Sequence, residues 1–500
     1  MEEKLNQLKQ HLAEVADLQY TGALLGWDLQ VNMPPGGSVG RSYQMSTIES
    51  LAHKMFTSPV IGQLLDALQP QVEKLDPDSD EARLVKVTRR EYEKRQRVPA
   101  EWVAEFAQIT AQAHTVWQEA RQENDYGKFR PMLEKIFDLR RRYAELFAPY
   151  QHIYDPLIDD FEPGLKTADV KAIFNNLRPQ QVALVKAITD RPQVDDSFLH
   201  LSYDEQKQWD FGVDVITRFG YDWKRGRQDR SAHPFTTHFG IDDVRITTRI
   251  FPNQMSSGLF STMHEAGHAL YEMGVEPSFG RTTLDGGVSL GFHESQSRMW
   301  ENLVGRSLPF WTYFYPRLQE VFPEQLKNVT LRSFYKGINR VQPSLIRVEA
   351  DEATYNLHVM LRLELEIALL EGQLSFKDLP EAWNSRIEEF LGLLPPNDAQ
   401  GVLQDVHWSS GYIGYFSTYA LGNLISAQLW ECIQADLPDV SEQIRQGQFT
   451  ELRGWLVNKI HRHGAKFEPQ EMMRSITSSQ IDPAAYMRYL TAKYTDIYSL

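Results

Sequence analysis

The residues His-Glu-Ala-Gly-His at positions 264–268 constrain this chain more than any other stretch. Their flanks favour a helix, on which positions i and i+4 lie on one face, one turn apart. His264 and His268 can therefore bind one metal ion, and Glu265 lies close enough to act on a water bound to that ion. The pattern predicts a zinc-peptidase site. The alternative is a coincidental helix face that carries two surface imidazoles.

Composition narrows the function by exclusion. A formal net charge of −15 disfavours nucleic acid and anionic membranes as partners, and no stretch reaches the roughly 18 apolar residues that span a bilayer. Cys432 is the only cysteine, so no intrachain disulfide is possible, and the first residues lack an apolar signal core. We therefore expect a cytoplasmic protein. The most basic stretch, 86–91, mixes bases with acids and is interpreted as a solvated helix face.

Apolar residues recur at helical spacing through most of the chain, as in the first 30 residues. Further helices are expected at about 79–97, 100–125, 128–148, 169–188, 204–219, 295–305, 350–371, 377–393, 411–435 and 481–497. Clear breakers stand at 34–37, 162–164 and 394–397. Because there is no linker, low-complexity tract or internal repeat, we expect one mostly α-helical catalytic domain over 1–500, with two lobes around a groove.

Residues 238–251 differ from the rest because they are rich in β-branched and aromatic side chains. Val244, Ile246 and Thr248 alternate with polar residues, which predicts a small antiparallel sheet just before the 264–268 helix. An exposed edge strand there could hold a peptide by main-chain hydrogen bonds. A purely structural hairpin is a compatible alternative.

A catalytic zinc needs a third protein ligand and an open position for water. A third histidine of the metzincin kind is excluded, because the required positions hold Tyr271 and Gly274. The downstream carboxylates are Glu272, Glu276, Asp285 and Glu294.

Glu294 is the predicted third ligand. Glu272 lies on the same helix as His268, whereas a third ligand usually comes from another element. The loop at 285–291 is long enough to reverse the chain, and Glu294 would then stand near the start of the next helix and face the first. Its alternative role is a carboxylate that interacts with the helix dipole. His293 is a weaker ligand candidate, and the glycines of the loop suggest a closing motion.

Six short motifs extend this pattern in order. They are His-Pro-Phe at 233–235, Asp-x-Arg-x-Thr at 243–247, the 264–268 motif, His-Glu-Ser-Gln at 293–296, Ile-Arg-x-x-Ala-Asp at 346–351 and Gly-x-x-Gln-Asp-x-His-Trp at 401–408. The set resembles that of the carboxypeptidase Taq family of metallocarboxypeptidases, within the gluzincin group. Each motif alone is weak, whereas the ordered set is specific.

The resemblance implies a mostly helical fold with a deep substrate groove and one zinc ion per subunit at its base, for which cobalt can substitute. It also implies a homodimer that removes single residues from peptides with a free C-terminus, with broad specificity and little action before proline.

Site roles follow from the same resemblance. Glu265 is expected to act as the general base on the metal-bound water. The stretch 407–416 is similar to one in peptidyl-dipeptidases, which implies that Tyr415 faces the oxyanion, Tyr412 binds the substrate carboxylate and His407 binds the substrate backbone. Aromatic core packing is the alternative for both tyrosines.

An exopeptidase must also recognise a free carboxylate, for which a planar guanidinium is well suited. Arg347 is the first choice, with an ion pair to Asp351 or Glu349 as its alternative role. Arg245 is second, and it could instead brace the sheet by pairing with Asp243. Two further residues are expected to contact substrate: Gln404, through the peptide backbone, and His233, lining the site.

Two other functions compete with the metallocarboxypeptidase. A dipeptidyl carboxypeptidase or an oligoendopeptidase would use the same metal site and differ in product length. A metal-stabilised helical scaffold would have a closed four-ligand site, in which Glu265 would have no purpose.

Overall fold

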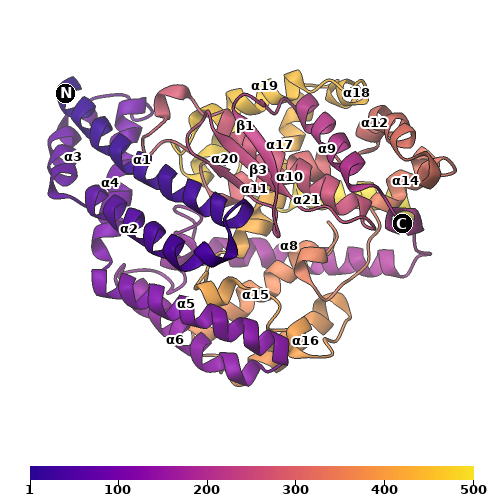
Figure 1. Ribbon diagram of the computed structural model, residues 1–500, viewed down its shortest axis with the longest axis horizontal. Helices are drawn as coiled ribbons and strands as arrows, with labels where there is room; N and C mark the ends of the chain where they lie inside the picture. The colour runs from indigo at the N-terminus through magenta and orange to yellow at the C-terminus, as the bar shows by residue number, and fades with distance from the viewer.

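The computed structural model describes all 500 residues, and its first four helices form a layer on one side of the molecule (Figure 1). The helices of this layer are α1 (Glu2–Val31), α2 (Ser38–Phe56), α3 (Pro59–Val72) and α4 (Asp80–Arg97). The expected apolar stripe of α1, from Leu5 to Val15, is buried. It belongs to a hydrophobic cluster of its own, which also takes in Val275, Phe279 and Leu284 from the segment after the 264–268 helix.

A second, larger hydrophobic cluster unites the remaining helices. Those before the sheet are α5 (Ala100–Glu123), α6 (Tyr126–Glu145), α7 (Asp155–Ile158), α8 (Thr167–Thr189) and α9 (Glu205–Phe219). Those after it are α10 (Met255–Met273), α11 (Leu290–Arg298), the π-helix η4 (Met299–Val304), α12 (Leu308–Val321), α13 (Pro323–Leu326), α14 (Leu331–Ile338), α15 (Tyr355–Leu370), α16 (Leu379–Leu391), α17 (Ser417–Asp436), α18 (Val440–Arg445), α19 (Thr450–Lys459), α20 (Pro469–Thr477) and α21 (Ala484–Tyr498).

The expected mostly α-helical fold is confirmed, and each predicted helical segment contains a helix. The boundaries differ where polar side chains cap the chain. The helix expected from 295 begins at Leu290, because Ser289 Oγ accepts a hydrogen bond from the Phe292 amide at 3.1 Å. The helix expected from 350 begins at Tyr355, since Asp351 Oδ1 accepts from the amide of Ala353 at 2.9 Å and holds a turn there.

The small sheet has strand order β1-β3-β2, from β1 (Gly226–Arg230), β2 (Thr236–His238) and β3 (Val244–Thr248). The expected antiparallel pairing is present between β2 and β3, with Thr237 opposite Arg245. However, β1 pairs with β3 in parallel, so the sheet is mixed rather than antiparallel. The β1 sequence, Gly-Arg-Gln-Asp-Arg, has no apolar alternation that could have revealed it.

The basic stretch 86–91 is not simply a solvated face. Thr88 is fully buried and its hydroxyl lies 2.7 Å from that of Thr283. Lys86, Val87 and Arg90 border a cavity of about 500 Å³ between α4, α1 and the loop before α11. No helix combines the length and the apolarity that a bilayer-spanning segment needs.

Candidate metal centre

Two helices bring the predicted metal ligands together. His264, Glu265 and His268 lie on α10, and Glu294 lies on α11, which packs against both α10 and α17. The close approach of α10 and α11 requires Gly267, because a Cβ atom there would lie 2.6 Å from the Cα of Ser297. The glycine inside the 264–268 motif is thus what lets the second helix deliver its carboxylate.

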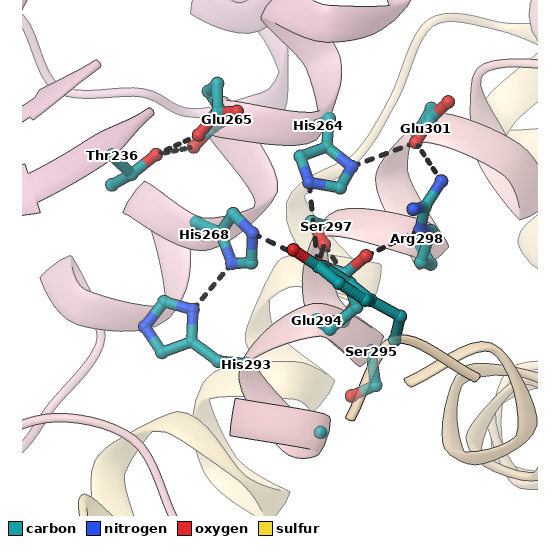
Figure 2. Close-up of polar contacts among 12 residues, drawn as sticks. Thr236, His264, Glu265, His268, His293, Glu294, Ser295, Ser297, Arg298 and Glu301 are labelled. Atoms are coloured by element: carbon teal, nitrogen blue, oxygen red, sulfur yellow. Dashed lines mark hydrogen bonds and ion pairs between the residues drawn. The ribbon is translucent and has the colours of Figure 1, made fainter. Parts of the chain in front are cut away.

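The three ligand atoms surround a space of the size of a metal ion. Oε2 of Glu294 lies 3.5 Å from Nε2 of His264 and 3.4 Å from Nε2 of His268. Two ligand atoms that each lie about 2.0–2.1 Å from a tetrahedral zinc ion are roughly 3.3 Å apart. Two imidazoles and one carboxylate therefore fit zinc in both donor type and spacing, and Figure 2 shows the three side chains pointing toward one another.

Outer partners orient both imidazoles (Figure 2). Nδ1 of His264 lies 2.9 Å from Oε2 of Glu301, and Nδ1 of His268 lies 2.6 Å from Nδ1 of His293. His293 in turn places Nε2 2.5 Å from Oε1 of Glu272. Because both Nδ1 atoms are engaged, both Nε2 atoms face the metal position. Burial lowers the pKa of His268 to about 4, which keeps this imidazole neutral and able to bind a metal.

The Glu294 carboxylate is held in its ionised form. Its Oε1 accepts a hydrogen bond from Nε of Arg298 at 2.7 Å, and its Oε2 accepts one from the Ser297 hydroxyl at 3.1 Å. Burial alone would raise the pKa of Glu294, but Arg298 and the two imidazoles outweigh burial and hold it well below its usual range. The alternative role of Glu294 at a helix start does not apply, because α11 begins four residues earlier.

Glu265 lies beside the ligands and is braced by the sheet. The Thr236 hydroxyl, on edge strand β2, donates to Oε2 of Glu265 at 2.7 Å (Figure 2). The residue is only 7% exposed, and burial raises the pKa of its carboxyl above the usual value. A carboxylate whose pKa is brought toward neutrality is better suited to take up a proton and give it back.

Arg347 is buried in a charged cluster. Its Nε and Nη2 lie 3.0 Å from Oδ1 of Asp405, and its Nη1 donates to the Tyr355 hydroxyl at 2.8 Å. Oδ2 of the same Asp405 pairs with Arg362, at 2.5 Å. The ion-pair partner is thus Asp405, and neither Asp351 nor Glu349. Asp405 thus contacts two guanidinium groups, one through each carboxylate oxygen.

An aromatic group joins Arg347 to the stretch 407–416. The guanidinium lies 4.9 Å from the ring centroid of Tyr419, whose hydroxyl is 3.2 Å from Nε2 of His407. Tyr415 stacks on Tyr412, with centroids 5.6 Å apart, and lies 5.4 Å from the His407 ring. Burial raises the pKa of Tyr415, and the charge of the Glu294 carboxylate adds to this rise.

The other predicted substrate-binding residues are more peripheral or internally engaged. Gln404 accepts from the Arg347 amide at 2.9 Å and donates to Leu345 O at 3.1 Å, so both ends of its amide already have partners. Arg245 pairs in a bidentate manner with Asp243, at 2.8 Å for each bond, which is its bracing role. His233 is exposed. Substrate contacts of these three residues stay predictions.

Several residues of the site were not predicted from the sequence. They are Thr236, Glu301, Tyr419, Phe161 and Arg298. Glu301 and Arg298 follow Glu294 at seven and four residues, which is the spacing of one helix face, and this signal was readable. Thr236 and Phe161 come from distant parts of the chain, and no sequence signal marks them as neighbours of the site.

The centre adjoins the cavity beside α4. His293 and Glu272 line it from the metal side, together with His238, whose Nδ1 lies 3.5 Å from Oε1 of Glu272. The far wall is formed by α1 and α4 of the N-terminal layer.

Comparison with known proteins places this site in a family. A model of the carboxypeptidase Taq (M32) metallopeptidases matches residues 7–494. Thermostable carboxypeptidase 1 of Thermus thermophilus is 41% identical over 497 residues, with 97% of each chain covered. Its counterpart from Pyrococcus furiosus is 38% identical, with 98% of each covered. The crystal structure of an M32 carboxypeptidase from Deinococcus radiodurans superposes with a TM-score of 0.97 at 42% identity and covers 100% of both chains.

Fold and site therefore define a metallocarboxypeptidase, a hydrolase of peptide bonds. This chain belongs to the carboxypeptidase Taq (M32) family. The resemblance drawn from the six motifs is confirmed.

Proposed function

We propose that the protein is a zinc carboxypeptidase that releases single C-terminal residues from peptides of varied sequence. The observation that carries this proposal is the placement of Glu265 beside three donor atoms spaced for zinc, with one edge strand next to them. A structural metal site would have no use for a second carboxylate that is not a ligand and is held by Thr236.

Zinc, when bound by His264, His268 and Glu294, would supply Lewis acidity and a water of lowered pKa. Glu265 takes a proton from the attacking water and passes it to the leaving amine nitrogen. Thr236 keeps that carboxylate aimed at the site through its 2.7 Å hydrogen bond. The Tyr415 hydroxyl donates a hydrogen bond to the oxygen of the scissile carbonyl as negative charge develops on that oxygen.

Peptide recognition is assigned to His407, Arg347 and Tyr412; the ring of Tyr412 lies 6.4 Å from that of Phe161, which lines the cavity. His407 is neutral, because burial lowers its pKa to about 3, and it can therefore hydrogen-bond to a peptide backbone without adding charge. Arg347 provides the positive charge for the free carboxylate, through the N–H groups that Asp405 and Tyr355 leave free. Tyr412, which is 49% exposed, is assigned to the same carboxylate.

A paired digest tests the proposal. Zinc-loaded protein and Glu265→Gln are each given an unblocked peptide and its C-terminally amidated twin, and products are read by mass spectrometry. We expect stepwise loss of single residues from the free-acid peptide only, and none with the variant. Release of dipeptides or internal cuts from both peptides would instead favour a dipeptidyl carboxypeptidase or an oligoendopeptidase. A comparison of zinc- and cobalt-loaded protein identifies which metals support the activity.

We also propose a cytoplasmic homodimer. The single cysteine supports a reducing compartment, and the dimer is supported by what the family resemblance implies. Light scattering on a sizing column tests the assembly, and fractionation of the source cell tests the location. A monomeric mass, or recovery outside the cytoplasm, would contradict the respective part.

A further inference from the structure

Glu366, in the middle of α15, is a buried carboxylate outside the metal centre. It is 0% exposed, and its three hydrogen-bond partners are all uncharged donors. Oε2 accepts from the Tyr154 hydroxyl at 2.5 Å and from the Gly414 amide at 3.0 Å, and Oε1 accepts from Nε1 of Trp408 at 2.7 Å. Burying a carboxylate without a cation is costly, so its retention calls for a purpose.

Two of these donors are neighbours of predicted site residues. Trp408 directly follows His407, and Gly414 directly precedes Tyr415. Glu366 therefore binds the chain at both ends of the segment 407–415, which has no long helix of its own and contains only a short 3-10 turn.

The turn at Gly414 adds a steric reason for a firm anchor. Its φ is +98°, and a Cβ atom there would lie 2.5 Å from the carbonyl oxygen of Leu157. Only glycine fits this close approach, and the hydrogen bond from its amide to Glu366 fixes the direction in which the chain leaves toward Tyr415. Phe161 closes the other side, with its ring centroid 5.1 Å from that of Tyr415.

We propose that Glu366 is a positioning residue, which holds His407 and Tyr415 at the metal centre by binding Trp408 and Gly414. The inference rests on the proposed roles of His407 and Tyr415. A core brace without influence on catalysis is the competing explanation, and the two differ in what they predict for turnover.

Glu366→Gln is the first variant, because it keeps the shape but not the acceptors. An amide has one oxygen, so either Trp408 or Gly414 must face an NH₂ group. We expect kcat on an N-blocked free-acid peptide to fall by about tenfold or more, against the roughly 10²–10³-fold cost of losing an oxyanion donor altogether. KM is expected to rise as well, because His407 is assigned to the peptide backbone, whereas the bound zinc per chain should stay within about twofold, because the metal ligands are untouched.

A double-mutant cycle with Tyr415→Phe separates positioning from general damage. If Glu366 acts through Tyr415, the Glu366→Gln change lowers kcat in the Tyr415→Phe background by less than about twofold. A general loss of fold or of active fraction multiplies with the Tyr415→Phe effect instead. Equal losses of kcat in both backgrounds would overturn the proposal.

Two further variants keep the test decisive if Glu366→Gln folds poorly. Trp408→Phe removes a donor from inside the segment 407–415 and is expected to lower kcat. It can replace Glu366→Gln in the double-mutant cycle with Tyr415→Phe. Tyr154→Phe is the matched control, since it removes a buried donor to the same carboxylate from outside that segment, and kcat is expected to change less than about twofold. A kcat loss in Tyr154→Phe as large as in Trp408→Phe would overturn the inference.

The activity of the wild-type protein separates a failure of the proposed function from a failure of the inference about Glu366. Zinc-loaded wild type that releases no amino acid would overturn the proposed function and this inference together. Active wild type with unchanged kcat in Glu366→Gln and Trp408→Phe would overturn the inference alone.

Discussion

Oδ1 of Asp405 lies 3.0 Å from both Nε and Nη2 of Arg347, and Arg347 is only 5% exposed. The guanidinium assigned to the substrate carboxylate is therefore held in advance by a carboxylate of the protein. Asp405 also binds Arg362, which is fully buried and has no access to a substrate. Arg347 and Arg362 thus pair with the same carboxylate, but only Arg347 is expected to bind substrate, whereas Arg362 is expected to stabilise the fold.

We expect Arg347→Lys to raise KM for free-acid peptides by about tenfold or more, because an ammonium cannot form the planar two-bond contact of a guanidinium. Arg362→Lys alters the other pair to Asp405 and serves as the control. It is expected to lower the free energy of unfolding with KM nearly unchanged. Steady-state kinetics and urea unfolding on both variants provide the comparison, and equal KM increases would argue against a carboxylate clamp at Arg347.

Glu301 is expected to act on the metal through His264. Glu301→Gln removes the charge that faces Nδ1 of His264, 2.9 Å away, and loss of such an outer partner typically weakens metal binding by about 10–100-fold. Competition with a fluorescent chelator measures the zinc dissociation constant. Glu320→Gln, at an exposed position of α12, is the control. An unchanged constant in Glu301→Gln would show that the geometry of His264 does not depend on this contact.

Zinc is expected to stabilise the folded protein, because it binds donor atoms that only the fold brings together. Binding adds RT ln(1 + [L]/Kd) to the free energy of unfolding, which is about 2.7 kcal/mol at a hundredfold excess over Kd. Thermal unfolding of chelator-treated protein, with and without added zinc, tests this. The rise in Tm should disappear in His268→Ala. A rise that persists in this variant would place the stabilising zinc elsewhere.

Glu162 makes stability depend on pH. It is fully buried near the start of α11, accepts a hydrogen bond from the Gly291 amide, and burial raises its pKa to about 8 from the ordinary 4.5. Between these two values the folded state keeps a proton that the unfolded state has lost. The free energy of unfolding must therefore fall as pH rises through this window.

Glu162→Gln cannot ionise, so its stability relative to wild type should improve from pH 5 to pH 8. The slope is at most about 1.4 kcal/mol per pH unit. Urea unfolding at several pH values measures the difference, in which the contribution of Glu366 cancels because both proteins contain it. A difference that does not vary with pH would contradict the prediction.

The sequence was sufficient to predict the three candidate metal ligands that the fold brings together, because their spacing is local or helical. His264 and His268 share one helix face, and Glu294 follows after a single loop. The long amphipathic helices were predictable for the same reason, since one apolar stripe packs on one core. Among the helices that were missed are α2, α3, α12, α14, α18, α19 and α20. Helix α2 buries only Ala52 and Phe56, which leaves little pattern to detect.

Contacts between distant segments could not be predicted from a single sequence. Nothing near Glu265 in the chain indicates Thr236 as its partner, and Asp405 becomes the partner of Arg347 only through the fold. Strand β1 was missed because its side chains are polar and its place in the sheet is set by pairing with β3. In each case the deciding interaction is tertiary, whereas the motifs are read along the chain.

The separate hydrophobic cluster of the N-terminal layer has a consequence for inactivation. Val275, Phe279 and Leu284 belong to that cluster, yet they lie in the segment that connects His268 to Glu294. If α1–α4 open as one cooperative unit below the global transition, the tether between the two halves of the ligand set is released while α10 and α11 remain folded. The enzyme would then lose its metal before it loses its helices. The opening of α1–α4, which amide hydrogen exchange measures, would set its working lifetime at high temperature, rather than the melting of the whole chain.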